Sequence, residues 1–326
     1  MKLRVSMLLF FAVNLTGFGR VEAQDWFQAS SPDARCCPSM VFDWTHYSTV
    51  LFGGNDVSGN LADTWKLGEG GWFQLTPATS PPARSAAGMA FDAATGTVVL
   101  FGGSNGTDLN DTWIWDGTTW AQVLTSKAPS GRRWDTQGMA YDAATGNVVL
   151  FGGVTSDGTM LGDTWTWNGK TRTWTEQHPA VSPSPRRAPI AYDWATGTVV
   201  LFGGEGSYGG PTFGDTWVWN GTNWRQLFPA TSPPARSMAS MAYDFSLRRL
   251  VLFGGCGAGS SAPFYNDTWT WNGTTWTQVS TAAAPPERYA FGMDYDPITQ
   301  GEVIFGGLFF FDTVRRGDTW KLAMKP

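Results

Sequence analysis

Cysteine and histidine are scarce in this sequence, and charged side chains are few. Of 326 residues, three are cysteine and two are histidine, and Asp, Glu, Lys and Arg together make up 15%. Three cysteines cannot all pair within one chain, and Cys36, Cys37 and Cys256 lack the spacing of a disulfide framework or a metal cluster. Cys256 could pair with either of the other two. We therefore expect a fold that depends on its hydrophobic core, with no structural metal and no cofactor.

Long apolar runs are also missing, apart from one near the start of the chain. Lys2 and Arg4 precede an apolar stretch over 7–13 that is too short to span a bilayer, and small residues up to Ala23 resemble a cleavage site. This pattern predicts a signal peptide over 1–23, and hence a secreted or periplasmic protein. No later segment has the roughly 18 consecutive apolar residues that a membrane helix needs, so we expect no membrane insertion.

The charge balance disfavours polyanionic partners. The whole chain carries a formal net charge of −5. Without residues 1–23 the count is 19 basic against 26 acidic residues, a net charge of −7. A negative protein is a poor match for nucleic acid or for an anionic membrane surface.

Two short motifs recur with a period of about 50 residues, which is typical of propeller blades. Phe-Gly-Gly and Asp-Thr-Trp each occur six times, with first glycines at Gly53, Gly102, Gly152, Gly203, Gly254 and Gly306, and aspartates at Asp63, Asp111, Asp163, Asp215, Asp267 and Asp318. In the second unit, alternating and β-branched residues predict strands over 85–92, 97–101, 111–115 and 119–123. Asp116-Gly117 between the last two strands favours a hairpin turn. Each unit is therefore expected to be a four-stranded antiparallel sheet.

The two ends of the chain predict how the ring closes. The fourth-strand pattern, Trp followed two residues later by Gln or Glu, is missing after Asp318 but occurs at 26–28. The predicted fold is thus all-β, one six-bladed β-propeller over 24–326, in which the N-terminal strand completes the last blade and covers its open edge. The blades are expected at about 35–75, 84–123, 133–177, 186–227, 236–279, and 288–322 joined by 25–30.

These motifs resemble kelch-repeat proteins over nearly the whole chain after residue 23. An apolar run ending in Gly-Gly is followed by a spaced aromatic pair, such as Trp113 with Trp120, although tryptophan stands where the family often has tyrosine. The resemblance implies the propeller of galactose-oxidase-type central domains. Kelch rings serve as binding modules, as parts of oxidases and as sugar-processing enzymes, so the site must decide the function. The copper site of the oxidase branch needs two histidines together, whereas His46 and His178 are expected on opposite faces.

An antiparallel sheet of this kind sorts its loops onto two faces. The first-to-second and third-to-fourth turns lie on one face, which we call the plain face because these turns are short and uniform. The second-to-third loops and the blade-to-blade linkers lie on the other, the variable face. Binding residues usually occupy variable loops on a rigid scaffold, so we expect a carbohydrate or protein ligand on the variable face. Trp44 and Trp194 fall on the plain face, where packing of a turn suffices.

Arginines in the linkers are the first candidates for ligand binding. One is assigned to each linker, at Arg35, Arg84, Arg133, Arg187, Arg236 and Arg288. Guanidinium groups that converge on a channel mouth could hold a carboxylate bidentately. The alternative is that a residue repeated in every blade pairs with its own blade, and both alternatives stay open.

Departures from the repeat supply the other candidates. Trp134 stands in a lengthened linker and is predicted as an exposed anchor for a sugar or a partner, with packing under a loop as the alternative. Tyr289 follows a linker arginine and joins the ligand-binding set. Glu205, directly after a Gly-Gly, and Asp135 are the weak candidates for proton transfer, and a solvated surface glutamate is the alternative for Glu205.

Two functional hypotheses follow. The first is a secreted binding module, without catalysis, that recognises a carbohydrate or an acidic protein segment on the variable face. The second is a sugar-processing isomerase similar to the six-bladed kelch mutarotases of acidic sugars, with arginines holding a carboxylate and Glu205 or Asp135 moving a proton. A Glu205 carboxyl within about 5 Å of two arginines in a concave mouth would favour the second.

Overall fold

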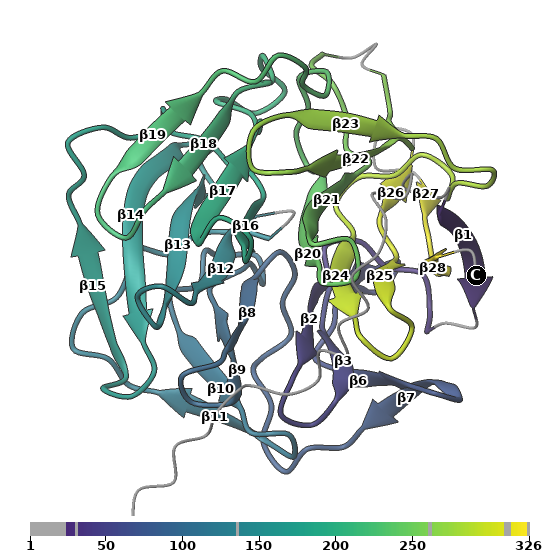
Figure 1. Cartoon of the computed structure of the whole chain (residues 1–326). Coiled ribbons are helices and arrows are strands. Elements are labelled where there is room, and N and C mark those ends of the chain that lie inside the picture. The colour runs from purple at the N-terminus through teal and green to yellow at the C-terminus, as the bar shows by residue number, and fades with distance from the viewer. Residues whose placement is uncertain (1–23, 30–31, 135–136, 260–262, 310–313, 325–326) are drawn as a thin grey trace, which may run out of the picture.

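The computed structural model describes residues 24–29, 32–134, 137–259, 263–309 and 314–324, without the side chains of 24–29 and 323–324. In this part of the chain the regular secondary structure consists of β-strands alone. Most of them form six four-stranded sheets around a central channel (Figure 1). The predicted six-bladed all-β propeller is confirmed. The predicted signal peptide lies outside the described residues. No helix among the described residues is long and apolar enough to cross a bilayer.

Each blade is an antiparallel meander that runs from the channel outward. Its strands, from the inside to the outside, are β2 (Ser39–Asp43), β3 (Ser48–Phe52), β6 (Thr64–Gly68) and β7 (Gly71–Leu75) in blade 1; β8 (Gly88–Asp92), β9 (Thr97–Phe101), β10 (Thr112–Trp115) and β11 (Trp120–Val123) in blade 2; β12 (Met139–Asp142), β13 (Asn147–Val154), β14 (Met160–Asn168) and β15 (Thr173–Gln177) in blade 3. They are β16 (Ile190–Asp193), β17 (Thr198–Phe202), β18 (Thr216–Trp219) and β19 (Trp224–Leu227) in blade 4, and β20 (Ser240–Asp244), β21 (Arg249–Phe253), β22 (Thr268–Trp271) and β23 (Trp276–Val279) in blade 5.

Blade 6 combines the two ends of the described chain. Its strands are β24 (Gly292–Asp296), β25 (Gly301–Phe305), β28 (Thr319–Met324) and β1 (Gln24–Ala29), in that order. β1 pairs antiparallel with β28 from Gln24 opposite Met324 to Ala29 opposite Thr319, and the two lie side by side in Figure 1. β1 thus covers the edge that β28 would otherwise expose. Two short hairpins, β4 (Asn55–Asp56) with β5 (Gly59–Asn60) and β26 (Leu308–Phe309) with β27 (Val314–Arg315), lie outside the blades.

The core lies between blades. The second strand of each blade is an apolar run such as Thr97–Phe101, and its residues from Val98 to Phe101 are fully buried because both faces of the sheet are covered by neighbouring blades. The innermost strands β2, β8, β12, β16, β20 and β24 each contact the next around the circle. The first strands therefore form the wall of the channel, and their termini form its two mouths.

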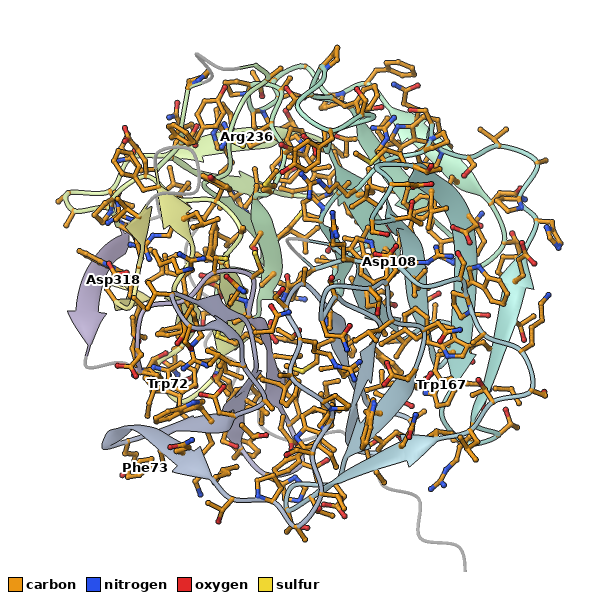
Figure 2. All side chains as sticks on the ribbon, turned by 180° about the vertical axis from the view of Figure 1, so that it is seen from behind. Trp72, Phe73, Asp108, Trp167, Arg236 and Asp318 are labelled. Atoms are coloured by element: carbon orange, nitrogen blue, oxygen red, sulfur yellow. The ribbon has the colours of Figure 1, made fainter. Side chains whose placement is uncertain are left out.

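The Asp-Thr-Trp motif connects neighbouring blades at five of the six junctions, counting the described side chains. The indole Nε1 of Trp120 on β11 donates to the Thr64 hydroxyl of blade 1 at 3.0 Å. The same bond joins Trp174 to Thr112, Trp224 to Thr164, Trp276 to Thr216, and Trp72 to Thr319. Figure 2 shows Trp72 and Asp318 on neighbouring blades of the ring. The spaced aromatic pair of the sequence thus includes a bond between blades that satisfies a buried N–H.

Candidate functional site

One arginine in each linker is buried in an ion pair with its own blade. Arg132 is representative, because its two terminal nitrogens contact the Asp163 oxygens at 2.6 and 2.8 Å and it also donates to the carbonyls of Gly152 and Ser130. We call the six the latch arginines, and their aspartate partners are Asp63 for Arg35, Asp111 for Arg84, Asp163 for Arg132, Asp215 for Arg186, Asp267 for Arg236 and Asp318 for Arg288. None is more than 2% exposed.

The structure corrects the sequence alignment in two blades. Arg133 and Arg187 were assigned to the repeated position, but Arg132 and Arg186 occupy it. A proline stands three residues before every latch arginine, at Pro32, Pro81, Pro129, Pro183, Pro233 and Pro285. That spacing is constant while the distance to the first strand varies, so it is the signal that would have identified the latch. The other four predicted ligand-binding arginines form ion pairs with aspartates of their own blades: Arg35, Arg84, Arg236 and Arg288. Their guanidinium groups therefore face protein rather than an open mouth.

Trp134 is buried, contrary to the expectation of an exposed anchor. Its side chain is 0% exposed, and its indole N–H donates to the carbonyl of Phe151 at 3.0 Å. The ring packs in the core between blades 2 and 3, against residues such as Met139. Tyr289 is buried as well and stacks on Phe264 with a 5.6 Å separation of ring centroids. Asp135 lies outside the described residues.

The residue after each latch arginine forms the mouth of the channel on the variable face. It makes a backbone bridge to the residue after each Gly-Gly, and we call these pairs the rim: Cys36 with Asn55, Ser85 with Ser104, Arg133 with Val154, Arg187 with Glu205, Ser237 with Cys256, and Tyr289 with Leu308. Most rim positions hold uncharged side chains. Blades 3 and 4 differ, because the second arginine of each Arg-Arg pair places a guanidinium at the rim.

Two adjoining cavities of about 250 Å³ each open beside the rim. One is lined mainly by rim residues of blades 1, 2, 4 and 6 together with Cys37, Met238, Ala290, Tyr208 and Arg315. The other is lined by Asn60, Ser85, Ala86, Ser104, Arg133, Arg187 and Tyr208. Arg187 and Tyr208 border both cavities. Asn60, Tyr208 and Arg315 were not among the sequence candidates, although all three lie in the second-to-third loops that the sequence placed on this face.

Glu205 is an ion-pair partner rather than a solvated glutamate. It is 3% exposed, and its Oε1 contacts Arg187 Nε at 2.6 Å and Nη2 at 2.5 Å. The Arg187 guanidinium also lies 5.4 Å from the centroid of the Tyr208 ring. The positive charge of Arg187 therefore balances the Glu205 carboxylate. This ion pair forms one wall of the mouth.

Arg133 is held more loosely than Arg187. Its side chain is 26% exposed, and its contact with Asp108 Oδ1 spans 4.0 Å. By comparison, Arg315 donates from Nε and Nη2 to both oxygens of Asn55, at 3.1 and 2.8 Å. A guanidinium whose carboxylate partner is at the limit of contact distance can accept a closer anion. Arg133 is thus the cation at the mouth that is best placed to receive a ligand.

The cysteines gather beside the same mouth. Cys37 and Cys256 pack against a cluster that contains Cys36, Tyr289 and Leu308. The histidines lie apart from this group: His46 contacts Asp43 in a plain-face turn at 2.8 Å, and His178 follows β15 in a linker. Among the described residues, no three or more His, Cys, Asp or Glu side chains are grouped in a way that could hold a metal ion.

Comparison with known proteins defines the family. Residues 138–325 match the family model described as the KLHDC2/KLHL20/DRC7 Kelch-repeats domain. The chain belongs to the kelch-repeat family. This kelch propeller is also similar to the solved structure titled "Structure of YjhT", with 17% sequence identity, a TM-score of 0.67, and coverage of 91% of this chain and 97% of that one. That likeness shows the fold. A comparison with curated proteins finds no match.

Proposed function

We propose that this kelch propeller is an exported binding module that holds an acidic carbohydrate at its variable-face mouth, with the ligand's carboxylate on Arg133. The observation that carries the proposal is the loose pairing of Arg133, whose contact with the Asp108 carboxylate is 4.0 Å at the edge of an open cavity; this distance is the shortest to a carboxylate of the described residues. Export rests on the signal-like pattern of residues 1–23.

The electrostatics of the mouth support an anionic ligand. The protein as a whole is negative, yet the two cavities are bordered by Arg133 and Arg315 in addition to Arg187, whose charge is balanced by Glu205. A local concentration of positive charge on a negative protein attracts small anions and leaves the remaining surface repulsive to them. Arginine is suited to this role because its planar fork matches the two oxygens of a carboxylate.

The shape and lining of the mouth favour a sugar over an acidic protein segment. The site is a pair of concave cavities rather than a flat surface, and polar side chains such as Asn60, Ser85 and Ser104 line one of them. Tyr208, 67% exposed, adds an aromatic face of the kind that stacks on sugar rings. Glu205 has a structural part in this proposal, because its carboxylate is already paired with Arg187.

The proposal is tested with an array that contains carboxylated glycans and their neutral counterparts. We expect binding to a subset of the carboxylated glycans, and we expect R133A to weaken it about tenfold or more, because one charge-assisted contact contributes on the order of 1.5–3 kcal/mol. Y208A should weaken binding to the same glycans. K127A is the matched control, since Lys127 is an exposed cation paired with Glu176, away from the rim.

Three outcomes would contradict the proposal. One is equal binding of neutral and carboxylated glycans. Another is an unchanged binding profile in R133A while K127A is also unchanged. The third is binding of acidic peptides in place of glycans, which would keep the cationic mouth but replace the ligand class.

A further inference from the structure

The channel mouth on the plain face holds a cluster of aromatic side chains, of which the sequence interpretation named only Trp44 and Trp194 and assigned both to turn packing. The Phe245 ring lies 5.0 Å from the Trp44 ring, 5.6 Å from the Trp194 ring and 5.4 Å from the Tyr295 ring, between centroids. These rings come from blades 1, 4, 5 and 6. They form an arc over the side of the mouth that these four blades make, and Trp194 and Phe245 are exposed there.

Blades 2 and 3 place Phe91 and Tyr141 in the lining of the same mouth but differ at the next position along the chain from the aspartate. At the position of Trp44, Trp194 and Phe245, directly after the aspartate that ends the first strand, blades 2 and 3 have Ala93 and Ala143. The arc therefore covers a cavity without filling it. The cavity, which we call the aromatic chamber, has a volume of about 120 Å³ and is lined by Trp44, Trp194, Phe245 and Tyr295 with the channel wall beneath them. A cavity of about 150 Å³ is enough to bind benzene, so the chamber suits a small group.

One residue of the channel wall departs from the repeat. Two positions before the terminal aspartate, five blades place a small apolar side chain in the lining of the chamber: Val41, Ala90, Ala140, Ala191 and Ala242. Blade 6 has Asp294 at that position. Asp294 is the one carboxylate among the residues that line the chamber, and no Lys, Arg or His is among them.

The protein gives the Asp294 carboxylate hydrogen bonds but no counter-charge. Its Oδ2 accepts from the Phe42 backbone N–H at 2.7 Å and its Oδ1 accepts from the Tyr295 N–H at 2.8 Å, which leaves further lone pairs on both oxygens. Burial raises the pKa of Asp294 to about 7, although the two hydrogen bonds by themselves would lower it. The negative charge of Asp296 also raises this pKa. Glu302, on the paired strand β25, is also acidic and feels the charge of Asp294. The chamber therefore holds a carboxylate for which its lining residues supply no positive charge. A cationic ligand would supply that charge.

We propose that the aromatic chamber binds a small organic cation, an alkylammonium or quaternary ammonium group, with its charge on Asp294 and its alkyl groups on the rings of Trp44, Phe245 and Tyr295. Aromatic faces attract cations, and the attraction increases where water is excluded. The charge of Asp294, which no lining cation balances, favours a cationic ligand over a neutral sugar. The chamber is separate from the variable-face mouth, so this inference does not depend on the proposed function.

The test compares two probes of the same shape. Isothermal titration of the folded protein with choline and with 3,3-dimethylbutan-1-ol, its uncharged isostere, measures the contribution of the charge. We expect choline to bind at least about tenfold tighter, which corresponds to about 1.4 kcal/mol. D294N should remove this preference, and F245L should weaken choline binding. R133A, on the opposite face, is the control and should leave it unchanged.

A second variant guards against misfolding of D294N, since that change also alters the bond to Phe42. A140L fills the chamber while Asp294 stays in place, and it should abolish choline binding in a protein that unfolds as cooperatively as the wild type. The proposal is overturned by equal affinity for the two probes, or by choline binding that survives A140L. Absence of saturable binding of choline, tetramethylammonium and benzyltrimethylammonium to the wild type would overturn it as well.

Discussion

Gln137 of blade 3 donates a hydrogen bond from its side-chain Nε2 to the backbone carbonyl of Met293 in blade 6, at 2.6 Å. These blades lie opposite each other in a ring of six, so the bond crosses the central channel. Gln137 also lines the aromatic chamber on the plain face. The bond therefore joins opposite blades at the inner end of that chamber.

Removing this bond should cost stability. Q137A is expected to lower the free energy of unfolding by about 1 kcal/mol, the usual net contribution of one hydrogen bond. Urea denaturation followed by tryptophan fluorescence measures the change. Q122A is the control, because Gln122 is an exposed residue on an outer strand. A Q137A midpoint equal to that of Q122A would show that the bond across the channel contributes nothing.

The two adjacent arginines of blade 3 should behave oppositely. R132A removes a fully buried guanidinium and leaves the partly exposed Asp163 without its partner, and it is expected to lower the free energy of unfolding by about 3 kcal/mol. R133A removes a loosely paired side chain at the rim and should cost well under 1 kcal/mol. Guanidinium denaturation of both variants checks the pair. Similar losses would mean that the latch position has been assigned to the wrong arginine.

Stability should fall as the pH rises through the neutral range. Burial raises the pKa of Asp294 to about 7 and that of Asp244 to about 6. A carboxyl whose pKa is raised by folding contributes its full stability below its unfolded pKa. This contribution is lost as the pH rises through the folded pKa. The slope is about 1.4 kcal/mol per pH unit for one proton. D294N should therefore flatten the stability profile between about pH 5 and 7. An unchanged slope in D294N would contradict the assignment.

The latch aspartates should act in the opposite direction at low pH. Burial by itself would raise the pKa of Asp163, but the hydrogen bonds and charge of Arg132 outweigh it and hold the pKa below its usual value. Stability from this pair is present above the unfolded pKa and is lost as the pH falls below it. Thermal unfolding of wild type and R132A should show a smaller acid-induced loss for R132A. A steeper loss in R132A would contradict this sign.

Deletion of β1 should weaken blade 6. A chain that starts at Pro32 lacks the partner of β28 and should unfold at a lower temperature, with faster amide exchange over Thr319–Met324, because that strand becomes an open edge. A chain that starts at Gln24 is the control and should keep the full stability. Equal exchange rates in the two chains would show that β1 does not contribute to the ring in solution.

The sequence predicted the ring because its evidence was repeated six times. Gly-Gly, Asp-Thr-Trp and the hairpin turns fix the strand order within each unit, and one such sheet cannot bury both of its faces alone. The strands predicted over 97–101 and 119–123 agree with β9 and β11 to within one residue at either end. Local pattern and tertiary packing require the same arrangement in these segments.

Prediction of the site was less successful, because it depends on where single side chains point. An Arg-Arg pair gives two candidates for one latch, and the spacing to the first strand selected Arg133 where the interior holds Arg132. Trp134 stands in a lengthened linker, which suggested exposure, but its ring turns inward against the neighbouring blade, where Gly138 and Gly153 lie close to it. Sequence spacing measures distance along the chain, and burial depends on neighbours from other blades.

The sequence by itself determined the number of blades, their strands and the division of loops between two faces, because these follow from periodic signals within each repeat. Only the tertiary structure decided which arginine of each Arg-Arg pair holds the latch aspartate, that Gln137 bonds across the channel, and that Trp44, Phe245 and Asp294 meet in one chamber. The physical reason is that these contacts join residues of different blades. Their energies depend on shape and charge across the ring, which no single repeat contains.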